Sequence, residues 1–378
     1  MPSRVPEVLR GVLRRGCAAG AGRRTIDTGS IGGARRAVSV RIKRISIEGF
    51  RAIREPLDLE WVDPRGAPLE RVVMAGPNGS GKTSVLEAIL LALGREELIV
   101  RDLPAVARGD HWRTDLASDA SVMLDCLDDV AGARFVVTRT ADRWEYRVGL
   151  EGHDIRVIDD PEDVRRALDS HRVEYFSSWR SPVLPGGLQP TTAGRSPADN
   201  EANRLRRLKQ QIINERARRA FRTQPTIVGL SKDERWLDRL NAVWSSFHTD
   251  DSMINADVVD PDADEPTFDL FVFDGSERRC SIDQVSSGEL ELLTVAGTLI
   301  LAEFDGLLLI DEPELHLHPE WQAQLLDMLR TAAPRAQLVV TTHASAPWDQ
   351  AYSFERFFLA PPNDPRSGVP QLAVAQDD

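Results

Sequence analysis

One glycine-rich segment, Gly76-Pro-Asn-Gly-Ser-Gly-Lys-Thr83, has the residue types and spacing of a loop that binds phosphate. Glycines let the backbone N–H groups of such a loop turn toward phosphate oxygens, and the N-terminus of the following helix adds partial positive charge. The lysine of this pattern reaches the β- and γ-phosphates of a nucleotide, and the final hydroxyl reaches Mg²⁺. The predicted phosphate-binding residues are Gly76, Pro77, Asn78, Gly79, Ser80, Gly81, Lys82, Thr83 and Ser84.

Two neighbouring carboxylates, Asp311 and Glu312, follow the wholly apolar run 307–310. A phosphate-loop enzyme needs one acid to hold Mg²⁺ and another to orient or deprotonate the attacking water. The sequence therefore predicts Asp311 and Thr83 as metal ligands, and Glu312 and Lys82 as catalytic residues. A solvated turn is the alternative for an acidic pair at a strand end, but the phosphate loop upstream argues against it.

Two further segments complete the set of candidate site residues. The sequence Val-Ser-Ser-Gly-Glu at 285–289 opens a predicted helix, so Ser286, Ser287 and Gly288 form a second candidate anion cradle. His343 follows an apolar strand and is predicted to act as a catalytic residue that senses the γ-phosphate. Each has an ordinary alternative, since such serines are common N-caps and lone histidines are usually structural.

In this order the segments resemble the nucleotide-binding domain of ABC-type ATPases, as its Walker A, signature, Walker B and switch-histidine motifs. The segment 42–51 (Ile-Lys-Arg-Ile-Ser-Ile-Glu-Gly-Phe-Arg) resembles the opening strand of the RecF, SMC and OLD group. The run 311–319 (Asp-Glu-Pro-Glu-Leu-His-Leu-His-Pro) is similar to an OLD-like element that the ATPase subunit of Septu-type phage defence shares. These motifs cover residues 42–94 and 283–345, while 95–280 is placed by position alone.

The resemblance implies an α/β fold, namely an ABC-type P-loop domain with an antiparallel β flank and a helical insertion. It also implies an AAA family ATPase that uses ATP and Mg²⁺. A homodimer is expected to form around ATP, with each signature segment completing the phosphate site of the other copy. Arg51 is expected to contact the base or ribose of the nucleotide, and an ordinary surface arginine is the alternative. The implied setting is phage defence or DNA maintenance, including DNA repair, with a separate effector protein such as a nuclease.

Three features depart from the family pattern. No clear Q-loop glutamine is present, and Arg180 or Gln189 stands in the expected region. The signature carries Ser287 and Glu289 where transporters usually have glycine and glutamine. OLD nucleases continue into a Toprim domain, but this sequence ends about 35 residues after His343, so we expect neither that domain nor nuclease activity here.

The hydropathy pattern predicts the elements that must hold these motifs. Residues 40–48 and segments within 120–158 alternate as strands of an antiparallel flank. Buried strands are predicted at 70–75, 307–310 and 337–341, and helices at 84–93, 200–248, 288–302 and 319–331. The acidic stretch 251–265 is predicted to be a surface loop. The predicted domains are a basic tail (1–40), a first ATPase lobe (41–160), a helical insertion (161–250) and a second ATPase lobe (251–378).

The amino-acid composition limits the classes of protein to which the chain can belong. The 378 residues are 42% hydrophobic and 28% charged, as in an ordinary globular protein, which excludes global disorder. The longest nearly apolar run, 292–302, is too short to span a bilayer, so no membrane partner is expected. Three scattered cysteines, Cys17, Cys126 and Cys280, argue for a reducing compartment, and a cytoplasmic location is expected.

The charge distribution is uneven. The net charge is −12, but residues 1–43 carry +8, so the remaining 335 residues carry −20. Such an acidic body does not attract nucleic acid through its average field. Any nucleic-acid contact is predicted at the basic helix 204–222, which carries Arg204, Arg206, Arg207, Lys209, Arg216, Arg218, Arg219 and Arg222. An acidic partner and a plain solvated face are the alternatives for this helix.

Two alternative functions compete with ATP hydrolysis in defence or DNA maintenance. One is the ATPase subunit of an ABC transporter, against which the opening strand, the His-Leu-His-Pro run and the central insertion all argue. The other is an ATP-binding switch with negligible turnover. His316 and His318 invite a metal-site interpretation, but their i, i+2 spacing and the lack of an evident third ligand favour structural roles.

Overall fold

The computed structural model of the chain describes residues 40–101, 116–129, 132–149, 156–180, 186, 188, 204–220, 234–248, 250–260, 262 and 267–360. All of them belong to one structural unit, Ala37–Asp378. The predicted basic tail lies, apart from Val40, outside the described residues. No described helix is both long and apolar enough to cross a membrane.

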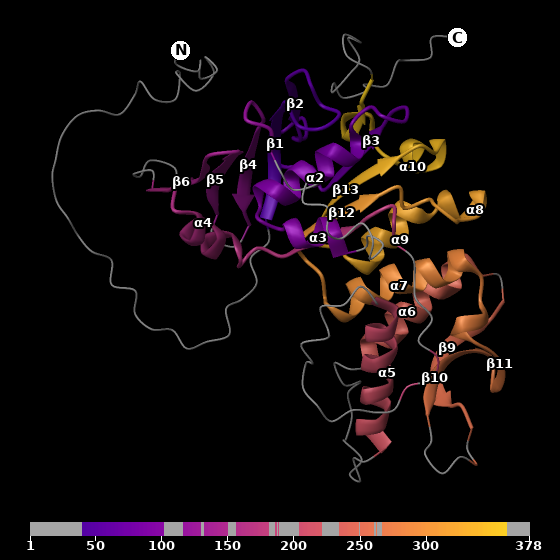
Figure 1. The fold of residues 1–378 in the computed structure, drawn as a ribbon. Helices are drawn as coiled ribbons and strands as arrows, with labels where there is room; N and C mark the ends of the chain where they lie inside the picture. The colour runs from indigo at the N-terminus through magenta and orange to yellow at the C-terminus, as the bar shows by residue number, and fades with distance from the viewer. Residues whose placement is uncertain are drawn as a thin grey trace, which may run out of the picture. The chain divides into compact units, whose positions relative to one another are not determined.

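Five parallel strands form the sheet that carries the phosphate loop (Figure 1). Their order is β14-β3-β13-β12-β8, with bounds β3 Arg71–Ala75, β8 Val173–Phe176, β12 Leu307–Asp311, β13 Gln337–Thr342 and β14 Arg356–Phe358. Every residue of β12 and β13 is buried, which explains their continuous apolar runs. Because the strands are parallel, the carboxyl ends of β3, β12 and β13 meet at one edge of the sheet.

A second sheet consists of six antiparallel strands in the order β2-β1-β4-β5-β6-β7. Their bounds are β1 Val40–Glu48, β2 Leu57–Glu60, β4 Ser121–Asp128, β5 Ala133–Thr140, β6 Trp144–Gly149 and β7 Arg156–Ile158. Buried and more exposed residues alternate along much of β1 and β5, as in a sheet with one face on the core. The predicted α/β class with an antiparallel flank is confirmed.

Helix α2, Lys82–Ala92, is buried between the two sheets. It contacts β1, β4 and β5 of the antiparallel sheet, and also β12 and β13 of the parallel sheet. A helix that is apolar all round is typical of such a position. Two short helices lie nearby: α3 (Glu96–Arg101) contacts α2 and β8, and α4 (Pro161–Leu168) contacts β6. Helix α2, which follows the phosphate loop, therefore packs against one sheet on each side.

The side chain of Gln337 joins the two sheets at the start of β13. It is buried, and its amide nitrogen donates to the carbonyl oxygens of Ile42 (2.9 Å) and Leu69 (2.8 Å). Its carbonyl oxygen accepts a hydrogen bond from the N–H of Ile42 at 2.6 Å. Ile42 lies in β1 and Leu69 just precedes β3, so one side chain satisfies backbone groups of both sheets.

The helical part of the described chain is built on α7, Ser287–Leu301, which α5 (Arg204–Ala220) and α6 (Glu234–Phe247) both contact. A small antiparallel sheet, β11-β10-β9, packs on α5 and α6. Its strands are β9 Ser252–Val258, β10 Phe268–Asp274 and β11 Glu277–Ser281, and the 3₁₀ turn η4 (Ile282–Gln284) follows. Lys209 of α5 is fully buried, with Nζ 2.6 Å from the carboxylates of both Asp269 and Asp283.

The predicted helix 319–331 is wrong as a single element. The chain forms α8 (Pro319–Gln322) and α9 (Leu325–Ala332), because Gln324 departs from helical geometry with φ −114° and ψ 0°. The side chain of Gln350 satisfies backbone groups on both sides of the break, donating to Gln322 O at 2.7 Å and accepting from Leu326 N at 3.1 Å. Gln350 ends α10 (Ser345–Gln350), and the turn η5 (Ser353–Glu355) follows.

Two other segments differ from the sequence-based expectation. The stretch 251–265 is not wholly a loop, because β9 pairs with β10 along its length and buries Ser252, Ile254 and Ala256 on one face. Strand β8 lies within the range predicted as a helical insertion, yet it is a strand of the parallel sheet beside β12. The boundaries of the four predicted domains stay predictions.

Candidate active site

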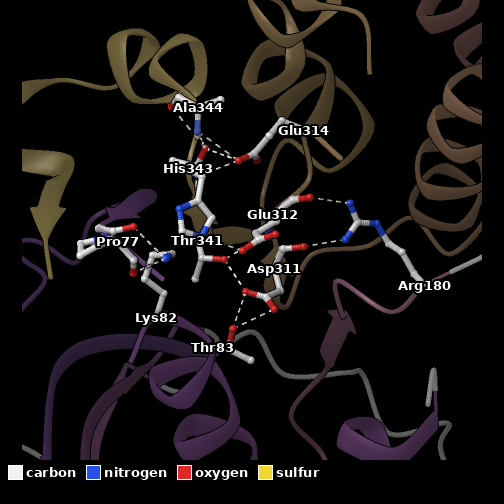
Figure 2. A network of polar contacts seen from close by, with 12 residues as sticks. Pro77, Lys82, Thr83, Arg180, Asp311, Glu312, Glu314, Thr341, His343 and Ala344 are labelled. Carbon is white, nitrogen blue, oxygen red and sulfur yellow. Dashed lines mark hydrogen bonds and ion pairs between the residues drawn. The ribbon is translucent and has the colours of Figure 1, made fainter. Parts of the chain in front are cut away.

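The phosphate loop connects β3 to α2, as the sequence predicts. Gly81 caps α2 with φ +95°, in the left-handed region that favours glycine. The ammonium of Lys82 lies within the loop, where Nζ donates to the carbonyl oxygens of Gly76 (2.9 Å) and Pro77 (3.2 Å) (Figure 2). Burial lowers the pKa of Lys82, although Glu312, Asp311 and Glu314 act in the opposite direction.

The loop has the chemistry that a polyphosphate requires. Pro77, Asn78 and Gly79 are exposed at its tip, so the loop is open to a ligand. The first turn of α2 leaves amide groups without intrahelical acceptors, and Ser80 Oγ is buried without a hydrogen-bond partner. A buried ammonium next to such donors gains most from an anion with several oxygens. The residues present therefore fit nucleotide phosphates.

A hydroxyl and a carboxylate meet beside the loop. Thr83 Oγ1 lies 3.0 and 3.1 Å from the two carboxylate oxygens of Asp311, which ends β12. Thr341 of β13 also donates to Asp311, at 2.5 Å. Mg²⁺ is usually held by one or two carboxylates and hydroxyls while phosphates and water complete its coordination. The pair Thr83 and Asp311 fits such an ion, as the sequence predicts.

Glu312 follows β12 and lies beside His343. Glu312 Oε1 and His343 Nε2 are 2.9 Å apart (Figure 2). Burial raises the pKa of Glu312, the neighbouring Asp311 raises it further, and His343 opposes the shift. A carboxylate with a raised pKa is suited to accept a proton near neutral pH. Its backbone has φ +48°, a left-handed conformation that costs a non-glycine residue roughly 1–2 kcal/mol.

Glu314 is a site residue that the sequence analysis missed. Its Oε1 accepts hydrogen bonds from Thr342 Oγ1 (2.6 Å), His343 N (2.7 Å) and Ala344 N (3.3 Å). It therefore holds the backbone that carries His343. The available signal was a further acid two positions after Glu312, within the run 311–319.

The two candidates for the Q-loop residue, Arg180 and Gln189, and the nucleotide-contact candidate Arg51 differ in what the structure shows of them. Arg180 is buried and donates hydrogen bonds to the backbone of Asp311 and Glu312. Gln189 lies outside the described residues. Arg51 forms an ion pair with Glu87 of α2, and its guanidinium lies 5.1 Å from the ring centroid of Phe50. A contact between Arg51 and a nucleotide stays a prediction.

The signature segment starts α7 and leaves two hydroxyls exposed. Ser286 is the N-cap: its Oγ accepts from Glu289 N at 3.3 Å, while Glu289 accepts from Ser286 N at 2.7 Å. Burial opposes the shift, but hydrogen bonds from Ser286 and His248 lower the pKa of Glu289. Ser286 and Ser287 are exposed and Gly288 is buried. Among the described residues, no hydrogen bond or ion pair joins this segment to the phosphate loop.

The histidines of the His-Leu-His-Pro run have structural partners. His316 Nδ1 lies 3.1 Å from Glu291 Oε2, and His318 caps α8 by accepting from Glu320 N at 3.4 Å. No group of three or more His, Cys, Asp or Glu side chains that could hold a metal ion occurs in the part of the chain that is described. The structural roles expected for both histidines agree with these contacts.

Residues 71–345 match the family described as "AAA domain, putative AbiEii toxin, Type IV TA system". The chain is 22% identical over 315 residues to a Septu protein PtuA of Bacillus mycoides, covering 80% of this chain and 38% of that protein. It is 26% identical over 332 residues to an OLD nuclease of Thermus scotoductus, covering 80% and 59%. The chain thus spans no more than 59% of the length of these two relatives. A solved SMC head bound to the C-winged helix domain of ScpA is similar over 82% of this chain and 92% of that one, with 15% identity and a TM-score of 0.49.

Proposed function

The chain belongs to the AAA-domain family that it matches over residues 71–345, and on that premise we propose that it is a Mg²⁺-dependent enzyme that hydrolyses ATP. One observation carries the proposal: Lys82, Thr83, Asp311, Glu312 and His343 converge at the carboxyl edge of the parallel sheet (Figure 2). In open α/β sheets, ligands bind outside the carboxyl ends of the strands.

Each of these residues has a role in the proposed reaction. The loop amides and Lys82 bind the β- and γ-phosphates, while Thr83 and Asp311 hold Mg²⁺, which supplies positive charge to the phosphate oxygens. Water attacks the γ-phosphorus as the bond to the bridging oxygen breaks, and Glu312 accepts the proton of the water. His343, at hydrogen-bond distance from Glu312, orients this carboxylate next to the γ-phosphate.

Removing the metal is expected to abolish hydrolysis. Without Mg²⁺ the oxygens of Asp311 and the phosphates repel one another, and the single positive charge of Lys82 is too small to balance both. Phosphate release by the purified chain should stop when EDTA exceeds Mg²⁺ and return when Mg²⁺ is restored. Equal release in EDTA and in Mg²⁺ would contradict the roles of Thr83 and Asp311.

The proposal extends to a homodimer and a setting. The exposed hydroxyls of Ser286 and Ser287 lie at a helix N-terminus, which suits contact with the γ-phosphate bound by a second copy. Similarity to a Septu protein PtuA and to an OLD nuclease supports a role in phage defence or DNA maintenance together with a separate effector, such as a nuclease. ATP binding would then bring two copies together and set the state of that effector.

Helix α5 supports a smaller proposal about nucleic acid. Arg206 and Arg207 are exposed, whereas Lys209 is buried between acids and Arg204 donates to Tyr175 O at 2.6 Å. The side chains of the other predicted basic residues, Arg216, Arg218, Arg219 and Arg222, lie outside the described part of the chain. The exposed Arg206 and Arg207 suit contact with a phosphate backbone, which basic side chains bind through counterion release.

Replacing both Arg206 and Arg207 by Glu is expected to weaken binding of DNA or RNA while ATP hydrolysis persists. Arg65→Glu with Arg335→Glu is the matched control, because both arginines are exposed and the charge change is equal. Wild-type affinity, measured by fluorescence anisotropy, should fall as salt rises. An affinity that does not respond to salt, or an equal loss in the control pair, would exclude a phosphate contact at this helix.

A further inference from the structure

A single guanidinium, that of Arg180, holds both peptide groups that flank Glu312 (Figure 2). Its Nη1 donates to the carbonyl oxygen of Asp311 at 2.6 Å, and its Nη2 donates to that of Glu312 at 2.8 Å. One carbonyl belongs to the peptide group before the Glu312 Cα and the other to the peptide group after it. Because the arginine fork is planar and rigid, it fixes the relative orientation of the two groups and hence the direction of the Glu312 side chain.

Arg180 is itself held by an acid on the signature helix. Its Nε lies 2.5 Å from Glu291 Oε1, and both side chains are only 6% exposed. The other carboxylate oxygen of Glu291 lies 3.1 Å from His316 Nδ1. A Cβ added to Gly288 would lie 2.6 Å from His316 O, so the start of α7 also packs directly on this backbone. Helix α7 therefore meets the segment after β12 at two places.

The segment after β12 has a conformation that needs such support. Glu312 and His316 have φ values of +48° and +66°, in the left-handed region that non-glycine residues seldom adopt. Conformations of this kind persist only where the surrounding structure over-determines them. The donors of Arg180 and the close packing of Gly288 are two such contacts, and the hydrogen bonds from Glu312 N to Thr341 are another.

We propose that Arg180 and Glu291 are positioning residues for hydrolysis. They hold the carboxylate of Glu312 in the direction from which it accepts the proton of water, and they couple that direction to the placement of α7. This inference rests on the proposed ATPase function. A change at the exposed serines that begin α7 thus reaches Glu312 through Glu291 and Arg180, without direct contact between the signature and the catalytic carboxylate.

Arg172 provides a matched control at the opposite end of the same strands. It precedes β8, whereas Arg180 follows β8. The guanidinium of Arg172 also holds backbone carbonyls, those of Ala302 (2.8 Å) and Glu303 (3.2 Å), and it pairs with Asp305 at 2.7 Å. Both arginines therefore anchor the chain next to β12, but only Arg180 does so at the catalytic end.

Arg180→Lys is expected to lower kcat by about 10²-fold, because a small misplacement of a reacting group is sufficient for a loss of this size. Lysine keeps the charge beside Glu291 but loses the planar fork. Affinity for Mg·ATP, measured by calorimetry, should stay within about twofold, since the phosphate loop is untouched. Arg172→Lys should leave kcat unchanged, and an Arg180→Lys variant with wild-type kcat would overturn the proposal.

A doubly apolar variant separates positioning from folding. Replacing a buried ion pair by apolar residues of similar size is often neutral or stabilising. Arg180→Met with Glu291→Leu is therefore expected to stay folded and to keep its ATP affinity while kcat stays as low as in Arg180→Lys. Its melting temperature should fall modestly, because the carbonyl oxygens of Asp311 and Glu312 lose their donor. Recovery of wild-type kcat in this variant would show that Arg180 only balances charge, and the positioning role would be wrong.

Amide hydrogen exchange tests the same contact without turnover. Leu315 N donates to Glu312 O at 3.2 Å, the oxygen that Arg180 also binds. Exchange of the Leu315 amide is expected to accelerate in Arg180→Lys and to stay at the wild-type rate in Arg172→Lys. Equal rates in all three proteins would overturn the proposal. A wild-type chain without ATP hydrolysis would instead overturn the proposed function, and the exchange rates would still decide whether Arg180 holds this segment.

Discussion

Lys82→Ala is expected to lose ATP binding and all hydrolysis. The ammonium of Lys82 donates hydrogen bonds to the carbonyl oxygens of Gly76 and Pro77, which are neutral groups. A bound phosphate supplies the negative charge that the loop itself does not provide. A charge-assisted hydrogen bond is worth roughly 1.5–3 kcal/mol. Two such bonds to phosphate oxygens correspond to a loss of affinity on the order of 10²–10⁴-fold. The substitution removes the hydrogen bonds of Lys82 to Gly76 O and Pro77 O but also a buried positive charge, so the melting temperature without nucleotide is expected to change little.

Calorimetry with Mg·ATP checks this expectation, together with a thermal melt of the chain without nucleotide. Lys43→Ala is the control, since it deletes the same side chain from a partly exposed position on β1. Unchanged ATP affinity in Lys82→Ala would contradict the assignment of the phosphate loop. A lowered melting temperature would show instead that Lys82 stabilises the loop without ligand.

Glu312→Gln is expected to trap an ATP-bound dimer. The amide keeps the shape of the side chain and leaves Asp311 and Thr83 to hold Mg²⁺, but it no longer accepts a proton from water. ATP then binds without being cleaved. A nucleotide that binds only the paired state shifts the population toward pairs. Light scattering should report one mass without nucleotide and twice that mass with Mg·ATP.

Adding Ser286→Arg to Glu312→Gln is expected to abolish the dimer, because a bulky side chain blocks the contact between α7 and the γ-phosphate held by the other copy. The substitution also removes an N-cap, which costs about 1 kcal/mol, so the melting temperature of each variant must be measured. Ser276→Arg, in the exposed turn between β10 and β11, is the matched control. A double variant that dimerises as well as Glu312→Gln alone would rule out a shared site at Ser286.

Much of the site is predictable from sequence because its parts are local patterns. The phosphate loop, the acids after β12 and the serines before α7 each combine a short motif with an adjacent strand or helix. Parallel strands then bring distant motifs to one edge, so the meeting of Thr83 with Asp311 and of Glu312 with His343 follows from topology.

The remaining residues depend on contacts that no local pattern records. Arg180 meets Glu312 across 132 positions of sequence, and the packing of α7 against the segment after β12 brings Glu291 to it. Lys209 lies in a strongly basic helix, a pattern that is typical of a solvated face. In the structure Lys209 is buried, and its ammonium contacts two acids from other elements, Asp269 and Asp283. The strand β9 was hidden by the acidic residues that lie before and after it in the sequence, although its buried residues alternate regularly.

The contact between the two sheets depends on the amide of Gln337 and would be weakened if the amide nitrogen were replaced by oxygen. Its nitrogen donates to two carbonyl oxygens and its oxygen accepts from Ile42 N. Neither atom of the amide can therefore be replaced by the other without losing these hydrogen bonds. Deamidation would place a carboxylate oxygen against the carbonyls of Ile42 and Leu69, turning two attractions into repulsions. Hydrolysis of the amide requires water, and the buried position keeps water away while the sheets stay together. The contact between β1 and β13 depends on the side chain of Gln337, and the same contact therefore protects that side chain from deamidation.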